Sequence, residues 1–358
     1  MTKKSTSVTI REVAAQAGVS VATVSRYLNQ TAPVSTDVAA RLARIMDELH
    51  YQPQAAARQL ASARTKVIGF LLLDLSKEFF APLLNGIESV VREHEYNLLI
   101  STYQAATQRQ PLPIGPHNAD GLIVFAESLP DQQLVELSQA AFPLVVVYRT
   151  PPRGLNLPFV TIENKAATFR LVEHLITTHQ RRRILFLRGP RDQEDSDWRE
   201  KGYRAALEAH QLPVDETLIL NADFESVTAY TGLRRYLAEH GRNFDAVFTG
   251  DDDAAIGVLT ALQEAGLRVP EDVSVAGFDD SKMSRFLQPP LTTVRAPTRQ
   301  VGQMAAEQLF NLISGEAMEQ EILLPTQLVL RSSCGCDYQG EETFPNPNTM
   351  LLKRFVSV

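Results

Sequence analysis

From residue 67 onward, short apolar runs alternate with amphipathic stretches. The runs are rich in Leu and in β-branched residues and are almost continuously apolar. Such runs predict parallel strands buried on both faces, and the stretches between them predict the covering helices, so we expect an α/β fold. Strands are predicted at 67–73, 97–102, 121–125, 144–148, 159–162, 184–187, 246–249 and 273–277. Helices are predicted near 79–94, 131–141, 163–179, 198–210, 226–240, 253–266 and 297–314.

The run is long enough for two doubly wound parallel-sheet subdomains, split near residues 160–163. We expect one domain over 67–335, with ligands bound at the carboxyl ends of strands and between its two halves. The expected bounds are 67–160 with 292–321 for the first subdomain, and 161–291 with 322–335 for the second.

Residues 9–35 predict two short amphipathic helices joined by a turn. Thr9 and Glu12 form a capping box that opens the first helix, Gly18 supplies the turn, and Ser20 caps the second helix. This is the pattern of a helix-turn-helix DNA reader, in a small all-α domain over 1–52.

The second of these helices has a distinct outward face. Val24 and Leu28, four residues apart, face inward. Small side chains beside Arg26 could enter a major groove, where Arg donates two hydrogen bonds to a guanine edge. On the helix pattern alone, an ordinary three-helix domain with solvated polar faces remains an alternative. The outward residues are Val21, Ala22, Ser25, Arg26 and Asn29.

Charge is distributed unevenly along the chain. Residues 1–66 carry nine Lys or Arg and four acids, whereas the remainder carries 26 bases and 38 acids. A basic head on an acidic body is the asymmetry expected of a polyanion-binding module, whose affinity falls steeply with salt.

Residues 53–66 are predicted to be a linker that contains a short helix at 54–62. Nine residues are too few for a stable lone helix in water, so this segment is expected to fold only on DNA or on a partner chain. A plain linker is the alternative. No secretory leader or bilayer-spanning run is found, so a cytoplasmic protein without membrane contact is expected.

Acidic residues follow two of the predicted strands. One cluster is Asp251–Asp253 and the other is Asp279–Asp280. They could ligate metal, act as acid and base, or cap helices, and Asp252 or Asp253 is expected to cap the helix at 253–266. Ionised Asp also accepts hydrogen bonds from paired sugar hydroxyls, and Arg199, expected to open the helix at 198–210, would complement it as a donor. No phosphate-binding loop is present.

Cys334 and Cys336 are the only two cysteines. They are too close in sequence to form an ordinary disulfide. They also supply only two of the four ligands that a structural zinc site needs. A structural role is expected, with redox sensing or shared metal binding as alternatives. The seven histidines are scattered without metal-ligand spacing, so no metal and no cofactor is expected.

The chain resembles the LacI/GalR (lactose-repressor/galactose-repressor) family of transcription regulators over about residues 9–335. The resemblance is carried by several separate segments of the sequence. They are Val13-Ala14, Ala17-Gly18-Val19-Ser20, Thr23-Val24-Ser25-Arg26, Asn29, Val34-Ser35, Tyr51-x-Pro53, Gln59-Leu60-Ala61, Ile68-Gly69, Val273-Ser274-Val275-x-Gly277-Phe278-Asp279-Asp280 and Pro290-Leu291-Thr292-Thr293-Val294.

The resemblance implies a homodimer, or a tetramer built from it, in which each recognition helix reads half of a palindromic DNA operator. Val21, Ala22 and Arg26 occupy the specificity positions, a combination typical of half-sites with a central CpG. Two Leu60 side chains would wedge the central step from the minor groove. The expected DNA-binding residues are Thr9, Ser20, Val21, Ala22, Thr23, Ser25, Arg26, Asn29, Ser35, Gln54, Arg58 and Leu60.

The resemblance also implies a small effector, a sugar or sugar derivative, in the cleft between the subdomains. Arg199 and Asp279 match the family's paired effector-binding positions, and Phe224 stands where an aromatic ring packs on a sugar. The expected effector-binding residues are Lys77, Phe79, Phe80, Tyr148, Arg199, Phe224, Asp251 and Asp279.

Several positions depart from the family pattern. Lys77-Glu78 replace the usual Asn-Pro, Tyr148-Arg149 replace Asp-Arg, and prolines interrupt residues 104–118, where a helix is expected to be shortened or lost. The tail at 336–358 is expected to be disordered. Two other functions were weighed: a periplasmic-type sugar-binding protein accounts for the body only, and an enzyme accounts for the acids only. A ligand-responsive repressor, not an enzyme, accounts for both head and body.

Overall fold

A computed structural model describes residues 8–29, 32–51, 64–103 and 111–337. The expected hinge helix, with Gln54, Arg58 and Leu60, lies outside these residues. The chain divides into two compact units, here called the head (residues 1–66 with 118–120) and the body (the remainder). Each is described by itself.

The head contains the two helices predicted within residues 9–35 and a third helix that follows them. They are α1 (Ile10–Ala17), α2 (Val21–Asn29) and α3 (Thr36–Glu48). Their apolar faces meet in one small core, so the helical spacing identified the buried side correctly. The fully buried members are Val13, Ala14, Ala17, Val24, Leu42, Ile45 and Tyr51.

Local hydrogen bonds fix where α1 and α2 begin. The Thr9 amide donates to Glu12 Oε2 at 2.6 Å and the Glu12 amide donates to Thr9 Oγ1 at 3.4 Å, which completes the capping box. Gly18 ends α1 with φ 63°, a left-handed conformation that favours glycine. The Thr23 amide donates to Ser20 Oγ at 3.1 Å, so Ser20 caps α2 as expected.

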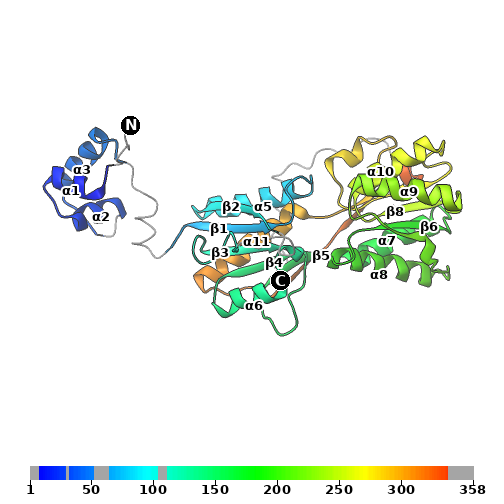
Figure 1. The fold of residues 1–358 in the computed structure, drawn as a ribbon, viewed down its shortest axis with the longest axis horizontal. Coiled ribbons are helices and arrows are strands. Elements are labelled where there is room, and N and C mark those ends of the chain that lie inside the picture. The colour runs from blue at the N-terminus through cyan, green and yellow to red at the C-terminus, as the bar shows by residue number, and fades with distance from the viewer. Residues whose placement is uncertain (1–7, 30–31, 52–63, 104–110, 338–358) are drawn as a thin grey trace, which may run out of the picture. The chain divides into compact units, whose positions relative to one another are not determined.

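The first half of the body is a six-stranded parallel sheet in the order β11-β5-β4-β3-β1-β2. Helices α5 and α11 lie on one face of it and α6 on the other (Figure 1). Because β1, β3 and β4 are covered on both faces, their side chains are almost all buried. The bounds are β1 Val67–Leu72, α5 Phe80–Glu93, β2 Asn97–Thr102, β3 Gly121–Phe125, η1 Ala126–Ser128, α6 Asp131–Gln139, β4 Leu144–Val147, β5 Phe159–Ile162, α11 Thr298–Ser314 and β11 Glu321–Leu324.

The second half is a four-stranded parallel sheet in the order β7-β6-β8-β9. Helices α7 and α8 pack together on one face, and α9 and α10 on the other (Figure 1). The two layered halves confirm the predicted α/β architecture. The bounds are α7 Asn164–Thr177, β6 Ile184–Arg188, α8 Glu194–Ala209, η2 Glu216–Leu218, β7 Ile219–Asn221, α9 Ser226–His240, β8 Ala246–Thr249, α10 Asp252–Glu264, β9 Ser274–Ala276 and η3 Lys282–Arg285.

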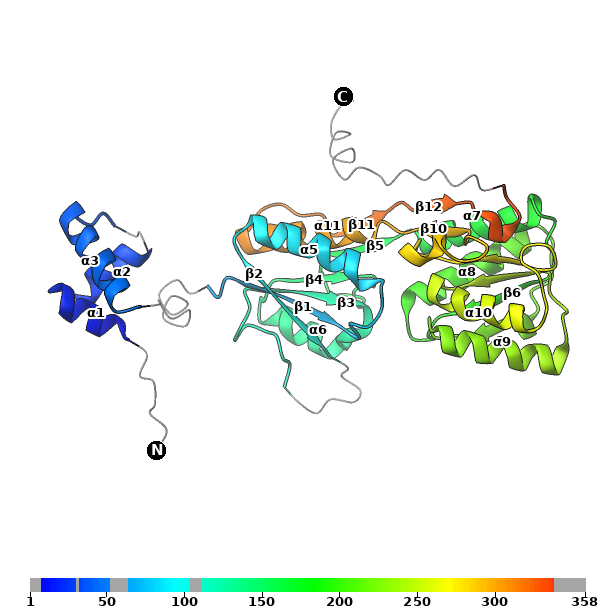
Figure 2. The ribbon, with the colours of Figure 1, turned by 90° about the horizontal axis from the view of Figure 1, so that it is seen from above.

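A short ladder joins the returning segments of the chain. Strand β10 (Thr293–Arg295) pairs antiparallel with β12 (Gln327–Val329), which leads to the turn η4 (Ser332–Cys334) (Figure 2). The expected boundary between residues 321 and 322 falls inside β11, which pairs with β5 and so belongs to the first sheet. The strands β7, β10, β11 and β12 were not predicted, because each is short and mixes apolar with polar residues, unlike the equally short but continuously apolar β4.

Two further expectations are resolved. Helix α8 begins at Glu194, four residues before the predicted start, so Arg199 lies in its second turn and does not open it. Residues 111–118 form bends and turns, as the prolines predicted.

Among the described helices, none combines the length and the apolarity that a bilayer crossing requires.

Candidate functional site

The outward face of α2 is the candidate DNA-reading surface. Val21 is 42% exposed, and Ala22 and Arg26 are exposed as well. Ser25 and Thr23 are half-buried, so Ser25 is less outward than expected. Asn29 is the last residue of α2, and its side chain lies outside the described set. The exposed part of this face is therefore two small residues beside a guanidinium, as the sequence predicts.

Three hydroxyl residues flank this face. Thr9 and Ser20 are exposed at the N-termini of α1 and α2, where their side chains cap the helices. Ser35 is exposed before α3 and makes no capping hydrogen bond. Hydroxyls and amides at helix N-termini suit contacts to phosphate oxygens, which position a protein on duplex DNA.

In the body, the ends of β6 and β8 form a platform for an aromatic ring. Phe224 lies over Gly189 and Gly250, so closely that a Cβ atom added at either glycine would come within 2.1 Å and 2.7 Å of the ring. Only glycine fits at these two positions. The backbone thus fixes the Phe224 ring at the carboxyl edge of the second sheet, where parallel sheets bind ligands.

Arg199 is a buried cation at the same edge. Its Nε donates to Asn164 Oδ1 at 2.9 Å, its Nη1 donates to the Gly250 carbonyl, and its Nη2 lies 3.5 Å from Asp279 Oδ1. The guanidinium also stacks 3.7 Å from the centre of the Phe278 ring. The structure therefore brings the predicted pair Arg199 and Asp279 together and holds it from several sides.

Carboxyl groups surround this cation. Burial raises the pKa of Asp279 to about 7, although the Arg199 charge opposes the shift. Burial likewise raises the pKa of Asp251 to about 6, although a hydrogen bond from the Ala254 amide lowers it in part. Burial also raises the pKa of Asp195 to about 6, although the nearby charge of Arg199 opposes the shift. Several acids with raised pKa values at one strand edge are typical of a ligand site.

The three aspartates that follow β8, Asp251–Asp253, have three different roles. Asp251, and neither Asp252 nor Asp253, caps α10: its Oδ1 accepts from the Ala254 amide at 3.0 Å. Asp252 is buried and accepts from Thr293 Oγ1 at 2.6 Å. Asp253 accepts from the Ser226 amide at 2.9 Å, which tethers α9. The cap predicted at Asp252 or Asp253 is therefore one or two residues too late.

Asp280, the neighbour of Asp279, has a structural role. Its carboxylate pairs with the buried Arg331 at 2.6 Å and with Arg295 at 2.6 Å. Burial alone would raise the pKa of Asp280, but these two cations lower it below its ordinary value. This clamp holds the loop that presents Asp279.

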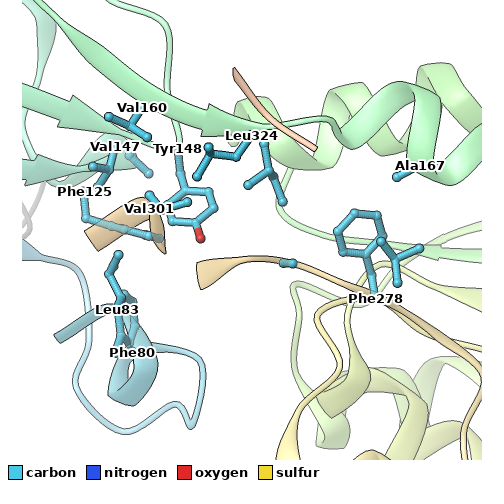
Figure 3. Close-up of a cluster of buried hydrophobic side chains, with 14 of the residues drawn as sticks. Phe80, Leu83, Phe125, Val147, Tyr148, Val160, Ala167, Phe278, Val301 and Leu324 are labelled. Atoms are coloured by element: carbon cyan, nitrogen blue, oxygen red, sulfur yellow. The ribbon is translucent and has the colours of Figure 1, made fainter. Parts of the chain in front are cut away.

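The first half of the body contributes aromatic rings. Phe79, Phe80, Phe125 and Tyr148 contact one another at ring-centre distances of 4.9–6.0 Å. Figure 3 shows Phe80, Phe125 and Tyr148 gathered beside the first sheet, with Phe278 and Ala167 on the other half. Phe80 and Tyr148 are buried in this cluster and Phe79 is half-buried.

The unusual pair Lys77-Glu78 joins the two halves. Lys77 Nζ donates to the Phe224 carbonyl at 3.0 Å and lies 2.8 Å from Glu225 Oε1. Glu78 Oε1 accepts from the Lys282 amide at 3.2 Å. These side chains therefore act first as bridges between the halves.

Three predicted effector residues have left-handed backbone conformations. The φ angles are 59° for Tyr148, 57° for Phe224 and 107° for Asp279. Such angles are unfavourable for residues with a Cβ atom and concentrate at ligand sites. Among the described residues, nine other non-glycine residues share such angles, so the conformation is consistent with a site here but does not by itself define one.

Sequence analysis missed three polar residues of the site. Asn164 Nδ2 donates to Asp195 Oδ1 at 2.7 Å, which links Asp195 to Arg199. Glu127 follows β3, and burial raises its pKa to about 7 against the charge of Arg149. Asn164 and Glu127 each stand within two residues of the end of a predicted strand, and that position was the available signal. Asp195 was hidden because α8 was predicted to start after it.

A pocket of about 540 Å³ adjoins this network. Asn164 and Glu194 line it together with Trp198, Phe169 and Leu323. None of the eight predicted effector residues lines it. Of the predicted residues, Arg199, Phe224 and Asp279 belong to the Arg199 network, and Lys77 forms the bridge to Phe224 and Glu225. Phe79, Phe80 and Tyr148 lie in the aromatic cluster.

The fold gathers four potential ligands at the end of the body. Cys334 and Cys336 lie with His174 and His179: one ligand atom from each of the four falls within 4.8 Å of the others. Cys336 also packs against the core, so the body extends past the expected end at residue 335, and the rest of the expected tail, 338–358, lies outside the described residues. Ligands from two distant segments have no spacing that a sequence pattern could reveal.

The chain is similar to families and proteins of known kind. Residues 9–54 match the family described as "Bacterial regulatory proteins, lacI family", and residues 172–334 match "Periplasmic binding protein-like domain". Catabolite control protein A of Priestia megaterium is 30% identical over 334 residues, which cover 91% of this chain and 99% of that protein.

Solved structures show the same likeness. The lac repressor dimer bound to operator and the anti-inducer ONPF has a TM-score of 0.78 and 27% identity, covering 92% of this chain and 99% of that one. The complex of the transcriptional regulator CelR with cellobiose has a TM-score of 0.66 and 30% identity, covering 91% and 99%. The likeness therefore extends over both the head and the body.

Proposed function

The chain belongs to the LacI family of bacterial regulatory proteins, and on that premise we propose that it is a cytoplasmic repressor controlled by a small sugar. It binds a palindromic operator as a homodimer, as the lac repressor dimer binds its operator. The observation that carries the proposal is the face of α2, where Val21, Ala22 and Arg26 stand exposed on a folded three-helix core. The relatives are regulators, and we assign no catalytic step to this chain.

In this proposal Arg26 reads a base and the neighbouring hydroxyl residues hold the backbone. A guanidinium can donate two hydrogen bonds to the O6 and N7 atoms of guanine, and the small Val21 and Ala22 allow α2 to enter the groove. Thr9, Ser20 and Ser35 lie at helix starts, from which they can donate to phosphates.

The effector in this proposal is a neutral polyhydroxylated molecule. The carboxyl groups of Asp195, Asp251 and Asp279 offset the two cations Arg199 and Lys77, so the site has no excess positive charge to attract an anionic ligand. Carboxylates accept hydrogen bonds from hydroxyls, a guanidinium donates them, and the Phe224 ring can pack on the apolar face of a sugar. The CelR complex with cellobiose supports a carbohydrate as the class to test.

Operator binding tests the DNA half of the proposal. Fluorescence anisotropy with the full chain would compare a labelled pseudo-palindrome carrying a central CpG with a scrambled duplex at several salt concentrations. Arg26→Ala should lose about 1–3 kcal/mol on the palindrome and little on the scrambled DNA. Arg44→Ala, an exposed arginine on α3 paired with Glu48, is the matched control. Equal loss on both duplexes would rule out base reading by Arg26.

A thermal-shift screen tests the effector half. Mono- and disaccharides at millimolar concentration should include a ligand that raises the Tm of the full chain by mass action. The same ligand should fail to raise the Tm of Asp279→Asn. A shift that persists undiminished in Asp279→Asn would place the ligand elsewhere.

A further inference from the structure

Four side chains that the proposed function leaves unused meet at the end of the body. His174 lies in the last turn of α7 and His179 follows that helix, while Cys334 and Cys336 end the segment after β12. In Figure 2 this last segment, in red, lies beside α7. The two histidines and the two cysteines come from segments more than 150 residues apart, so only the fold brings them together.

The ligand atoms lie close enough together to share one metal ion. His174 Nε2 lies 3.2 Å from His179 Nε2 and 3.4 Å from Cys336 Sγ, which is itself 3.4 Å from His179 Nε2. Cys334 Sγ lies 3.8 Å from His174 Nε2, and all four atoms fall within 4.8 Å of one another. Zinc bonds of about 2.0 Å to nitrogen and 2.3 Å to sulfur place tetrahedral ligands roughly 3.3–3.8 Å apart. The distances among His174, His179 and Cys336 are close to that geometry, and a small inward movement of Cys334 would complete it.

Neighbouring groups orient the ligands. Thr178 Oγ1 lies 3.2 Å from His174 Nδ1, so that nitrogen can hold its proton while Nε2 faces the centre of the cluster. Thr292 Oγ1 lies 3.0 Å from Cys334 Sγ and helps to position that side chain.

The residue between the two cysteines fits the same arrangement. Gly335 has φ 111°, and a Cβ atom there would lie 3.0 Å from His179 Nδ1. A side chain at this position would be strained and would crowd the histidine. Glycine thus lets the Cys334–Cys336 turn close against the His179 ring.

We propose that His174, His179, Cys334 and Cys336 form a tetrahedral zinc site that fastens the end of the body to α7. Two thiolates and two neutral imidazoles balance the charge of Zn²⁺, which suits the half-buried position. Four protein ligands leave no open coordination position, so the site is structural and not catalytic. The proposal is independent of the proposed function.

Metal analysis of the full chain tests the site. The protein is prepared with a removable affinity tag, equilibrated with zinc, passed through a chelating resin and measured by mass spectrometry of the elements. The expected result is about one zinc per chain. Cys336→Ser and His179→Ala should lose it, and His240→Ala, on α9 outside the cluster, should retain it. Metal content that is negligible in the wild type, or unchanged in Cys336→Ser, would overturn the proposal.

A second measurement needs no variant. Replacing zinc with Co²⁺ should produce the intense visible bands of a tetrahedral cobalt centre together with thiolate-to-cobalt charge transfer in the near ultraviolet. A mercurial that blocks both thiols should abolish these bands and release the metal. Weak octahedral cobalt bands without thiolate charge transfer would overturn the proposal, and would do so even if the variants failed to fold.

Discussion

The two halves of the body contribute opposite chemistry to the candidate effector site. The first half presents aromatic rings that pack on one another, among them Phe80 and Tyr148. The second half presents a buried guanidinium, Arg199, and carboxyl groups such as Asp251 and Asp279. We therefore expect the first half mainly to shape the site, and the second half, which also carries Phe224, to supply most of the groups that hydrogen-bond a ligand.

This difference teaches that the two halves should fail differently when they are changed. Removing a ring should cost stability, because its neighbours lose packing. Removing a charged group should weaken ligand binding and change how stability depends on pH, because the buried groups of opposite charge that paired with it are left without a partner.

The largest effect is expected from Phe80→Ala. Phe80 is buried between Phe79 and Phe125, at ring-centre distances of 5.5 Å and 4.9 Å, so its removal leaves a cavity. The free energy of unfolding should fall by about 3–5 kcal/mol, measured by denaturant titration. Phe286→Ala, at a residue that is 66% exposed, is the control and should change it by less than about 0.5 kcal/mol. Similar losses in both variants would contradict the packing role.

The next effect is expected from Arg199→Met. This change removes the partner of Asp279 and the donor to Asn164, so effector affinity should fall by about 2–4 kcal/mol, roughly 30- to 1,000-fold. Calorimetry with the ligand found by thermal shift provides the measurement. Arg268→Met, at an exposed arginine paired with Asp272, should leave affinity unchanged. If Arg199→Met bound the effector with normal affinity, Arg199 would not be part of the effector site.

A smaller effect is expected in the dependence of stability on pH. Burial raises the pKa of Asp251 to about 6, so the folded chain holds a proton that the unfolded chain releases near pH 4. The contribution of Asp251 to stability is therefore full below about pH 4, declines as pH rises toward 6, and stays low above that. Asp251→Asn keeps a capping side chain but removes this titration.

The measurement is the difference in free energy of unfolding between wild type and Asp251→Asn at pH 5 and at pH 7.5. Most other titrating groups are common to both proteins, so the difference reports Asp251 together with its electrostatic effect on Asp279. Wild type should lose on the order of 1 kcal/mol more than the variant as pH rises. Parallel pH curves would show that Asp251 is not desolvated.

The smallest effect is expected at the bridge between the halves. The Lys77–Glu225 pair is partly exposed, so Lys77→Met should change the free energy of unfolding by no more than about 1 kcal/mol. A double-mutant cycle with Glu225→Gln, repeated at high salt, measures the coupling. A coupling that is large and insensitive to salt would mean that the bridge is as desolvated as the Arg199 network.

The head could be predicted from the sequence almost completely. Its signals are local: Thr9 and Glu12 cap α1 within one turn, Gly18 sets the bend, and the spacing of Val13 and Ala17 identifies the buried face. Neighbouring residues determine each of these features, so the sequence carries them directly. The long buried strands of the body were predictable for the same reason.

The candidate site was predictable in part. The resemblance identified Arg199 and Asp279, and the structure brings them together. Asp195 and Asn164 were missed because their roles depend on contacts across separate elements. The His174 and Cys334 cluster was missed for the same reason, because its ligands are distant in sequence and meet only when β12 returns beside α7. Pairing between distant segments lies beyond what local patterns encode.

The most direct test of the account is the operator affinity of the full chain with and without the sugar that raises its Tm. The account predicts salt-sensitive binding of the palindrome that the sugar changes at least about tenfold, a coupling of about 1.4 kcal/mol. It also predicts that Arg199→Met binds the operator normally but no longer responds. Binding of the sugar to the body with no change in operator affinity, or no salt-sensitive binding of duplex DNA at all, would contradict it.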